Sequence, residues 1–235
     1  MFQKIIAFVI FFQLVSCAEL NQVIQTLPNA TLSNAQIADG LKQALDKGIT
    51  EQVSLLAVKD GFYKNEMVKI LLPPELQKVD ATLRKIGLSN VADQGLKVLN
   101  RAAEDAVGQA TPIFVEAIKE LTFNDAKNIL LGNQNAATTY LEEKTKVALY
   151  QKFNPVIANS FKRVGADKVW ETIISRYNVI PLTNNVNPDL TDYVTNEALK
   201  GVYKMIAVEE VKIRSDVNSR TTEILKRVFA LQDNK

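Results

Sequence analysis

Apolar residues recur along most of the chain at spacings of three and four, the pattern of helices that bury one face. The clearest run follows Ser89, where the steps alternate between three and four. Its apolar positions are 96, 99, 103, 106, 110, 113 and 117. Several are alanine, so a neighbouring helix backbone can approach closely. The run predicts helices packed in an antiparallel bundle.

Polar and helix-breaking residues predict where the helices begin and end. Ser33 is followed three residues later by Gln36, as in a capping box, and Thr122 is a second N-cap. Pro112 lacks a backbone N–H and crowds the preceding turn, so we expect a break near Thr111. The ranges expected to be helical are about 18–27, 34–48, 50–58, 74–86, 89–110, 123–131, 134–152, 155–164, 166–177, 189–215 and 218–231.

One stretch departs from the helical pattern. Val68, Ile70 and Leu72 alternate with other residues, which predicts a short extended segment or hairpin near 67–72. The chain contains no glycine-rich phosphate loop and no internal repeat. The predicted fold class is therefore all-α: an irregular multi-helix bundle in which residues 35–235 form a single domain.

The first 16 residues have the layout of an export signal. Lys4 precedes a largely apolar run from Ile5 to Val15, and a run of about 7–15 residues is typical of the apolar region of a signal peptide. A membrane-spanning helix needs about 20 residues. We therefore expect residues 1–16 to be a signal peptide rather than a transmembrane anchor.

The end of this run resembles the lipobox of bacterial lipoproteins, because Leu-Val-Ser at 14–16 precedes Cys17. The resemblance implies that Cys17 carries diacylglycerol through a thioether, becomes the new N-terminus and is N-acylated. Each buried CH₂ contributes about 0.8 kcal/mol, and two or more acyl chains hold a protein stably on a membrane. Residues 17–34 would then be a lipid-anchored tether. The alternative is ordinary cleavage after Cys17, since residues 15–17 also fit a small-residue cleavage site.

Composition narrows the chemistry that the chain can perform. It has no histidine, and Cys17 is its one cysteine. This excludes Ser-His-Asp and Cys-His catalysis, histidine-ligated zinc, Glu-x-x-His di-iron sites and disulfides. Beyond residue 16 the chain carries 27 basic and 26 acidic residues, a balance without the basic footprint of a nucleic-acid-binding protein. We expect no nucleic-acid partner, no metal and no cofactor.

Polar residues on the alanine-rich helix are the first candidates for a site. Asn100 and Glu104 lie on the flank of its apolar run, and Arg101 can pair with Asp105 four residues later. Their functional interpretation is a polar cluster that lines a groove. Their structural interpretation is a set of hydrogen bonds that tie helices together.

A second set lies on the long helix near the C-terminus. Glu209 falls within an apolar stripe, whereas Glu210 lies off the stripe and can reach Arg214 one turn on. A carboxylate that faces the core must be paired or neutralised. The expected partner of Glu209 is an arginine or a lysine, and Arg101, Arg214 and Arg220 are the candidates. Glu209 would suit a general acid, and the alternative is a buried ion pair that fixes helix register.

Several stretches resemble a bacterial family of unassigned activity, domain of unknown function 4197. They are AQIADGLKQAL (35–45), DGF (60–62), KILLP (69–73), LNRAAEDAV (99–107), DAKNILLGNQNAATTYL (125–141), FNPVI (153–157), DLTDYVTNEALKGVYKMIAVEEVKIR (189–214) and RTTEILKRVF (220–229). They occur in the family's order and cover most of the chain after the tether. The resemblance implies an exported envelope protein with a helical fold, and it implies no activity.

Three functions remain open. The first is a non-enzymatic, lipid-anchored envelope protein with a binding or structural role. The second is a carboxylate-dependent envelope hydrolase with Glu104 or Glu209 as its acid, which needs two carboxyl groups about 5–9.5 Å apart. The third is a carrier that binds an apolar ligand between helices. Ala18 stands where an aspartate often retains lipoproteins in the inner membrane, which favours the outer membrane, facing the periplasm.

Overall fold

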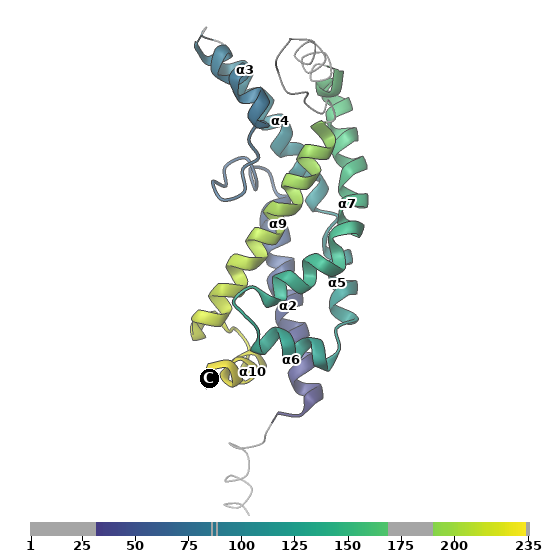
Figure 1. Cartoon of the computed structure of the whole chain (residues 1–235), viewed down its shortest axis with the longest axis vertical. Coiled ribbons are helices and arrows are strands. Elements are labelled where there is room, and N and C mark those ends of the chain that lie inside the picture. Colours follow the sequence, from purple (N-terminus) through teal and green to yellow (C-terminus); the bar gives the residue numbers. More distant parts are fainter. Residues whose placement is uncertain (1–31, 86, 88, 169–189, 234–235) are drawn as a thin grey trace, which may run out of the picture.

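The computed structural model describes residues 32–85, 87, 89–168 and 190–233, and these form helices joined by turns, with no strand among them. Figure 1 shows an elongated bundle. The helices are α2 (Asn34–Ala57), α3 (Pro74–Lys85), α4 (Ser89–Val107), α5 (Thr111–Lys119), α6 (Phe123–Leu131), α7 (Ala136–Val164), α9 (Leu190–Ser215), the 3₁₀ turn η2 (Val217–Ser219) and α10 (Glu223–Asp233). The predicted all-α, irregular multi-helix bundle is confirmed.

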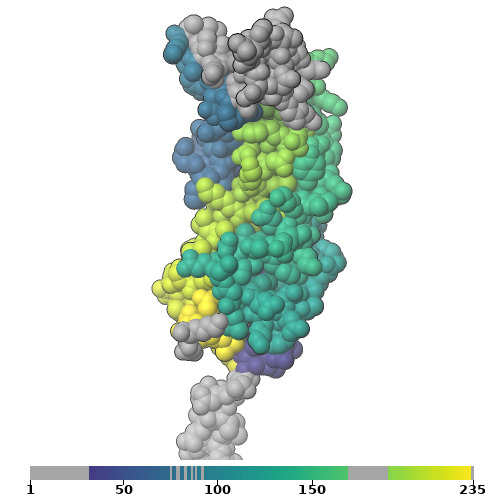
Figure 2. Space-filling view, in the orientation of Figure 1, coloured from purple at the N-terminus to yellow at the C-terminus, as the bar shows by residue number. Residues whose placement is uncertain are grey.

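The four longest of these helices, α2, α4, α7 and α9, pack against one another along the bundle. Helices α6 and α10 close the end where α2 begins, and α3 lies at the opposite end beside α4 (Figure 1). In the space-filling view of Figure 2, α9 runs obliquely across the molecule and α7 lies along one of its sides. None of the helices in the described residues is long and apolar enough to cross a membrane.

In the part of the chain that the structure describes, the buried side chains form two clusters. The larger one lies between the long helices and includes Phe62, Phe114 and Phe153, each fully enclosed. Ala102, Ala103 and Ala106 of α4 line it with almost no exposure, as the small-residue run predicts. The smaller cluster joins the start of α2 to α6 and α10. The two clusters position the polar residues described below.

Three predicted helix ends are confirmed. Ser33 and Gln36 form a reciprocal capping box, with hydrogen bonds of 2.9 and 3.2 Å. Thr122 caps α6 in the same way. Helix α4 ends at residue 107 and α5 begins at 111, so the break ahead of Pro112 is present.

Two predicted breaks are wrong, because long helices continue through Gly48 and Pro155. Helix α2 runs unbroken through Gly48, since Ile49 and Val53 beyond it are buried in the same core as the preceding turns. Helix α7 runs unbroken through Pro155. Pro155 is exposed to solvent, while Phe153 and Ile157, two residues before and after it, are buried. Tertiary packing outweighs the local helix-breaking tendency at both positions.

Segment 67–72 is neither a strand nor a hairpin. The alternation is real, because Val68, Ile70 and Leu72 are all buried. The backbone of Ile70 nevertheless bonds to a side chain: its N–H donates to Asn100 Oδ1, and its carbonyl accepts from Asn100 Nδ2, both at 2.8 Å. Asn100 therefore takes the place that a second strand would occupy.

Two other predicted ranges differ in position. The last helix begins at Glu223 rather than near 218, because the turn η2 precedes it. The helix expected over 18–27 lies outside the described residues, as does most of the one expected over 166–177.

Two glycines in long helices should respond to alanine in opposite directions. A Cβ at Gly201 would lie 2.7 Å from Cε1 of the enclosed Phe62 ring, whereas one at Gly48 would meet nothing closer than 3.8 Å. We expect Gly201→Ala to lower the free energy of unfolding by about 1–3 kcal/mol through overpacking. Gly48→Ala should raise it by about 0.5–1 kcal/mol, because glycine is entropically costly inside a helix. Urea denaturation measures both, and a stabilised Gly201→Ala variant would contradict the packing described.

Candidate functional site

The most enclosed charged pair of the described residues is formed by Glu210 and Arg214 on α9. Glu210 Oε1 accepts hydrogen bonds from Arg214 Nη2 at 2.8 Å and Nε at 3.0 Å. The two side chains are 7% and 3% exposed. The predicted contact between these residues is confirmed, and both are buried. A pair removed so far from water must satisfy its remaining donors and acceptors elsewhere.

Glu210 satisfies its remaining acceptor capacity at the N-terminus of α7. Its Oε1 accepts from the backbone N–H of Ala137 at 2.9 Å, and its Oε2 accepts from the N–H and hydroxyl of Thr138 at 2.9 and 2.8 Å. The first N–H groups of a helix have no partner within the helix, and Asn135 at the N-cap makes no side-chain capping bond. A glutamate from another helix therefore caps α7, where its negative charge also favours the helix dipole.

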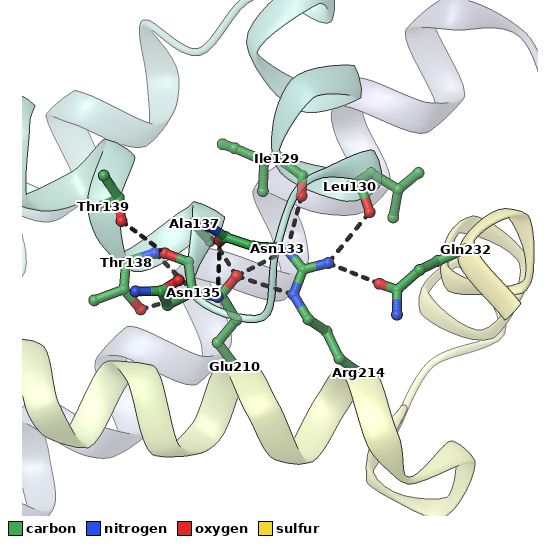
Figure 3. A network of polar contacts seen from close by, with 10 residues as sticks. All are labelled: Ile129, Leu130, Asn133, Asn135, Ala137, Thr138, Thr139, Glu210, Arg214 and Gln232. Carbon is green, nitrogen blue, oxygen red and sulfur yellow. Dashed lines mark hydrogen bonds and ion pairs between the residues drawn. The ribbon is translucent and has the colours of Figure 1, made fainter. Parts of the chain in front are cut away.

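Arg214 caps the opposite kind of helix end, the C-terminus of α6, by donating hydrogen bonds to its carbonyl groups (Figure 3). Its Nη2 donates to the carbonyl of Ile129 at 2.7 Å, and its Nη1 to that of Leu130 at 3.2 Å. The same Nη1 donates to Gln232 Oε1 on α10 at 2.7 Å. A cation is favoured at the negative end of a helix dipole. One ion pair thus holds the end of α6, the start of α7 and the short connection between them.

Arg220 extends this network toward the C-terminus. It is 2% exposed, and it donates to the carbonyls of Ile213 and Arg214, each at 3.0 Å, near the end of α9. It also forms a two-pronged ion pair with Asp233 on α10. The guanidinium groups of Arg214 and Arg220 both lie within 6 Å of the Phe229 ring. The hydrogen bond to Asp233 raises the pKa of Arg220, and Arg220 lowers the pKa of Asp233.

Glu104 forms the centre of a second network, around the turn that follows α2. It is 3% exposed and accepts hydrogen bonds from the N–H groups of Asp60, Phe62 and Tyr63 at 3.1–3.2 Å. Arg101 bridges Glu104 and the Asp60 carboxylate. Hydrogen bonds from Lys64 and Arg101 lower the pKa of Asp60. Glu104 therefore holds the turn through the backbone N–H groups of the turn. Within the turn, Asp60 adopts a left-handed backbone conformation with φ 73°.

Three predictions about individual residues need correction. Glu210 is the enclosed carboxylate of α9, whereas the Glu209 side chain is 18% exposed and lies near Gln52 at 3.4 Å and Lys212 at 3.7 Å. The ionic neighbour of Glu209 is a lysine, one of the two residue types expected, and none of the three candidate arginines pairs with it. The predicted pair of Arg101 and Asp105 does not form, because Asp105 binds Arg163 at 2.8 Å instead.

The seven candidate residues therefore fall into separate groups. Glu210, Arg214 and Arg220 meet at the α6–α10 end, Arg101 and Glu104 meet at the turn after α2, and Asn100 and Glu209 each have other neighbours. The expected burial of Asn100 and Glu104 is confirmed, at 0% and 3% exposure. The remaining candidate, Cys17, lies outside the described residues.

The sequence did not reveal the partners of these charges, namely Asp60, Thr138, Gln232 and Asp233. Asp60-Gly61 is recognisable from the sequence only as a turn. The start of α7 gave no signal either, because Asn135 is by residue type a good N-cap, and only the structure shows that its side chain makes no capping bond. A long helix without a local cap needs a partner from elsewhere in the chain, and Glu210 is that partner.

The space around the enclosed pair is small. Residues of α2, α6 and α9 surround a cavity of about 30 Å³ beside Glu209, Glu210 and Arg214, which is room for about one water molecule. It is far below the several hundred Å³ that a bound apolar ligand would need. In the described parts of the chain, no three acidic or cysteine side chains gather as a metal would require.

The fold and these networks define an all-α protein whose buried charges hold helix ends and turns in place. The family model described as "Protein of unknown function (DUF4197)" matches residues 31–230. The chain belongs to this family, which confirms the resemblance drawn from the sequence. The comparisons with curated proteins and with solved structures gave no match.

Neighbouring glutamates on α9 provide a matched test of the capping network. Glu210→Gln removes the charge that compensates buried Arg214, so we expect the free energy of unfolding to fall by about 3–5 kcal/mol. Glu209→Gln removes a partly exposed charge near exposed Lys212 and should change it by less than about 1 kcal/mol. Chemical denaturation of both variants measures the difference. Equal losses would show that Glu210 does not hold the two helix ends.

Proposed function

We propose that this chain is a non-enzymatic binding protein of the bacterial cell envelope, anchored by acylated Cys17. The non-enzymatic part rests on one observation: the candidate catalytic carboxylates are already occupied by contacts within the protein. Glu104 is enclosed and bonded to three backbone N–H groups and an arginine, so it has no free lone pair directed at a substrate. Glu209, the other candidate acid, lies beside Gln52 and Lys212 and borders a cavity of about 30 Å³, which is too small for a substrate.

The N-terminal sequence supports the anchor. A charged residue, an apolar run and the Leu-Val-Ser-Cys motif follow one another in residues 4–17, and acyl chains on Cys17 would supply membrane affinity without a spanning helix. Ala18 favours the outer membrane over the inner, with the domain facing the periplasm. The first described helix, α2, begins at the α6–α10 end of the bundle (Figure 1). The tether would therefore join the domain at that end and leave the opposite end available to a partner.

Substitution of the cysteine tests the anchor. We expect Cys17→Ser to abolish incorporation of radioactive palmitate and to release the protein from the membrane fraction of cells. Ser16→Ala is the matched control: it keeps a small residue ahead of the cysteine and should preserve both labelling and membrane association.

Intact mass distinguishes the alternatives. Acylated protein begins at Cys17 and carries the mass of its acyl chains, whereas ordinary cleavage leaves an unmodified chain that begins at Ala18. Unlabelled wild-type protein with that second mass would refute the lipid anchor.

A further inference from the structure

A groove of about 460 Å³ lies on the surface between α4 and the end of α7. Its size falls within the range of about 300–1,000 Å³ that is usual for ligand sites. The end of α7 that lines it lies at the end of the bundle opposite α6 and α10 (Figure 1). The capping networks at the α6–α10 end do not reach it.

The described residues that line the groove carry more positive than negative charge. Lys97, Arg101 and Arg163 face a single acidic residue, Asp105. Asp105 is already compensated, because it accepts hydrogen bonds from Arg163 Nη2 and Ser160 Oγ, both at 2.8 Å. Lys97 is exposed and has no hydrogen-bonding or ionic partner within the described part of the chain. An anionic group in the groove would supply the missing charge.

Arg101 is held in position before any ligand arrives. Its Nη1 bonds to Glu104 and its Nη2 to Asp60, and 26% of its side chain remains exposed. Glu104 is enclosed beneath the surface, whereas the Asp60 side chain is 23% exposed and also pairs with Lys64. A side chain that is already immobilised loses little conformational entropy on binding.

The groove also offers apolar contacts and an elongated shape. Val98 and Ala102 of α4 and Val164 of α7 line it, and Val164 is 61% exposed. The lining residues of α4 extend from 94 to 105, which corresponds to about 16 Å at 1.5 Å per residue. An extended peptide of about five residues covers that length.

We propose that the groove binds a short extended segment of a partner protein in which carboxylate side chains alternate with small apolar ones. The cations would pair with the carboxylates, and the valines would contact the apolar side chains. This proposal rests on the binding role proposed above and specifies the chemistry of the partner. The partner would meet the domain away from the end where the tether enters.

Fluorescence anisotropy with a defined peptide tests the groove. The probe is a fluorescein-labelled hexapeptide in which glutamates alternate with valines, added to the full chain purified in a non-ionic detergent. We expect saturable binding that weakens as ionic strength rises. Lys97→Glu should weaken it at least tenfold, and Lys97→Arg should restore it to within about twofold of wild type.

Matched controls separate the groove from a general effect of charge. Lys127→Glu makes the same charge change on an exposed lysine of α6, at the other end of the bundle, and should leave the affinity within about twofold. A hexapeptide with lysines in place of the glutamates should not bind. The proposal would be overturned if both peptides bound alike, or if Lys97→Glu and Lys127→Glu lowered the affinity equally.

Other occupants would give distinct results. Full displacement of the probe by free glutamate at the same carboxylate concentration would show that the groove takes a small anion, which overturns a peptide partner. A wild-type dimer in sedimentation that Lys97→Glu disperses would assign the groove to a second copy of the chain. Peptide binding is measured whether or not Cys17 is acylated, so its failure is distinguishable from failure of the anchor.

Discussion

The Glu210–Arg214 ion pair is the interaction on which the arrangement of the helices at one end of the molecule depends. Its acid satisfies the unpaired N–H groups at the start of α7, and its base satisfies the unpaired carbonyls at the end of α6. Removing two charges from water is costly, and their mutual attraction seldom compensates fully. Here each charge also performs a capping role that a hydrophobic replacement could not. The connection between α6 and α7 is only a few residues long, so capping both of its ends also fixes the angle between the helices.

The same principle recurs at the turn after α2 and at the end of α9. Glu104 and Arg220 are each enclosed, and each bonds to backbone groups of another segment or of a helix end. In all three cases a charged side chain takes the place of a local cap or turn residue, from a helix for Glu104, Glu210 and Arg214 and from the segment after η2 for Arg220. Enclosed charges often mark catalytic sites, but the bonds of these charges are directed at the backbone rather than at an open cavity. The bonds of these charged side chains to the backbone therefore account for their burial, and no catalytic role is needed to explain it.

Features set by neighbouring residues were predictable from the sequence, and features set by distant ones were not. The caps at Ser33 and Thr122 and the break ahead of Pro112 depend on a few adjacent residues, and all three are present. Glu209 and Glu210 could not be told apart correctly, because α9 contacts α2, α4 and α7 and is buried over a wide arc. A single apolar stripe then no longer defines the inner face. Glu210 is the enclosed glutamate because it caps the start of α7, which has no local side-chain cap. The residues that it caps lie more than 70 positions away in the sequence.

The position of Arg101 connects the structural network to the surface. Asn100 and Glu104 use the inner side of α4 to hold the segment after α2, and Arg101 completes that network while remaining partly exposed in the groove. Any ligand that engages Arg101 would therefore meet a side chain whose orientation the turn at Asp60 already fixes. Lys97, one helical turn away and without a partner among the described residues, supplies a second charge beside this fixed one. An immobilised guanidinium beside a lysine, whose four-carbon stem is flexible, would suit a partner whose carboxylates vary in position, because the first would set the register and the second would adjust to the sequence.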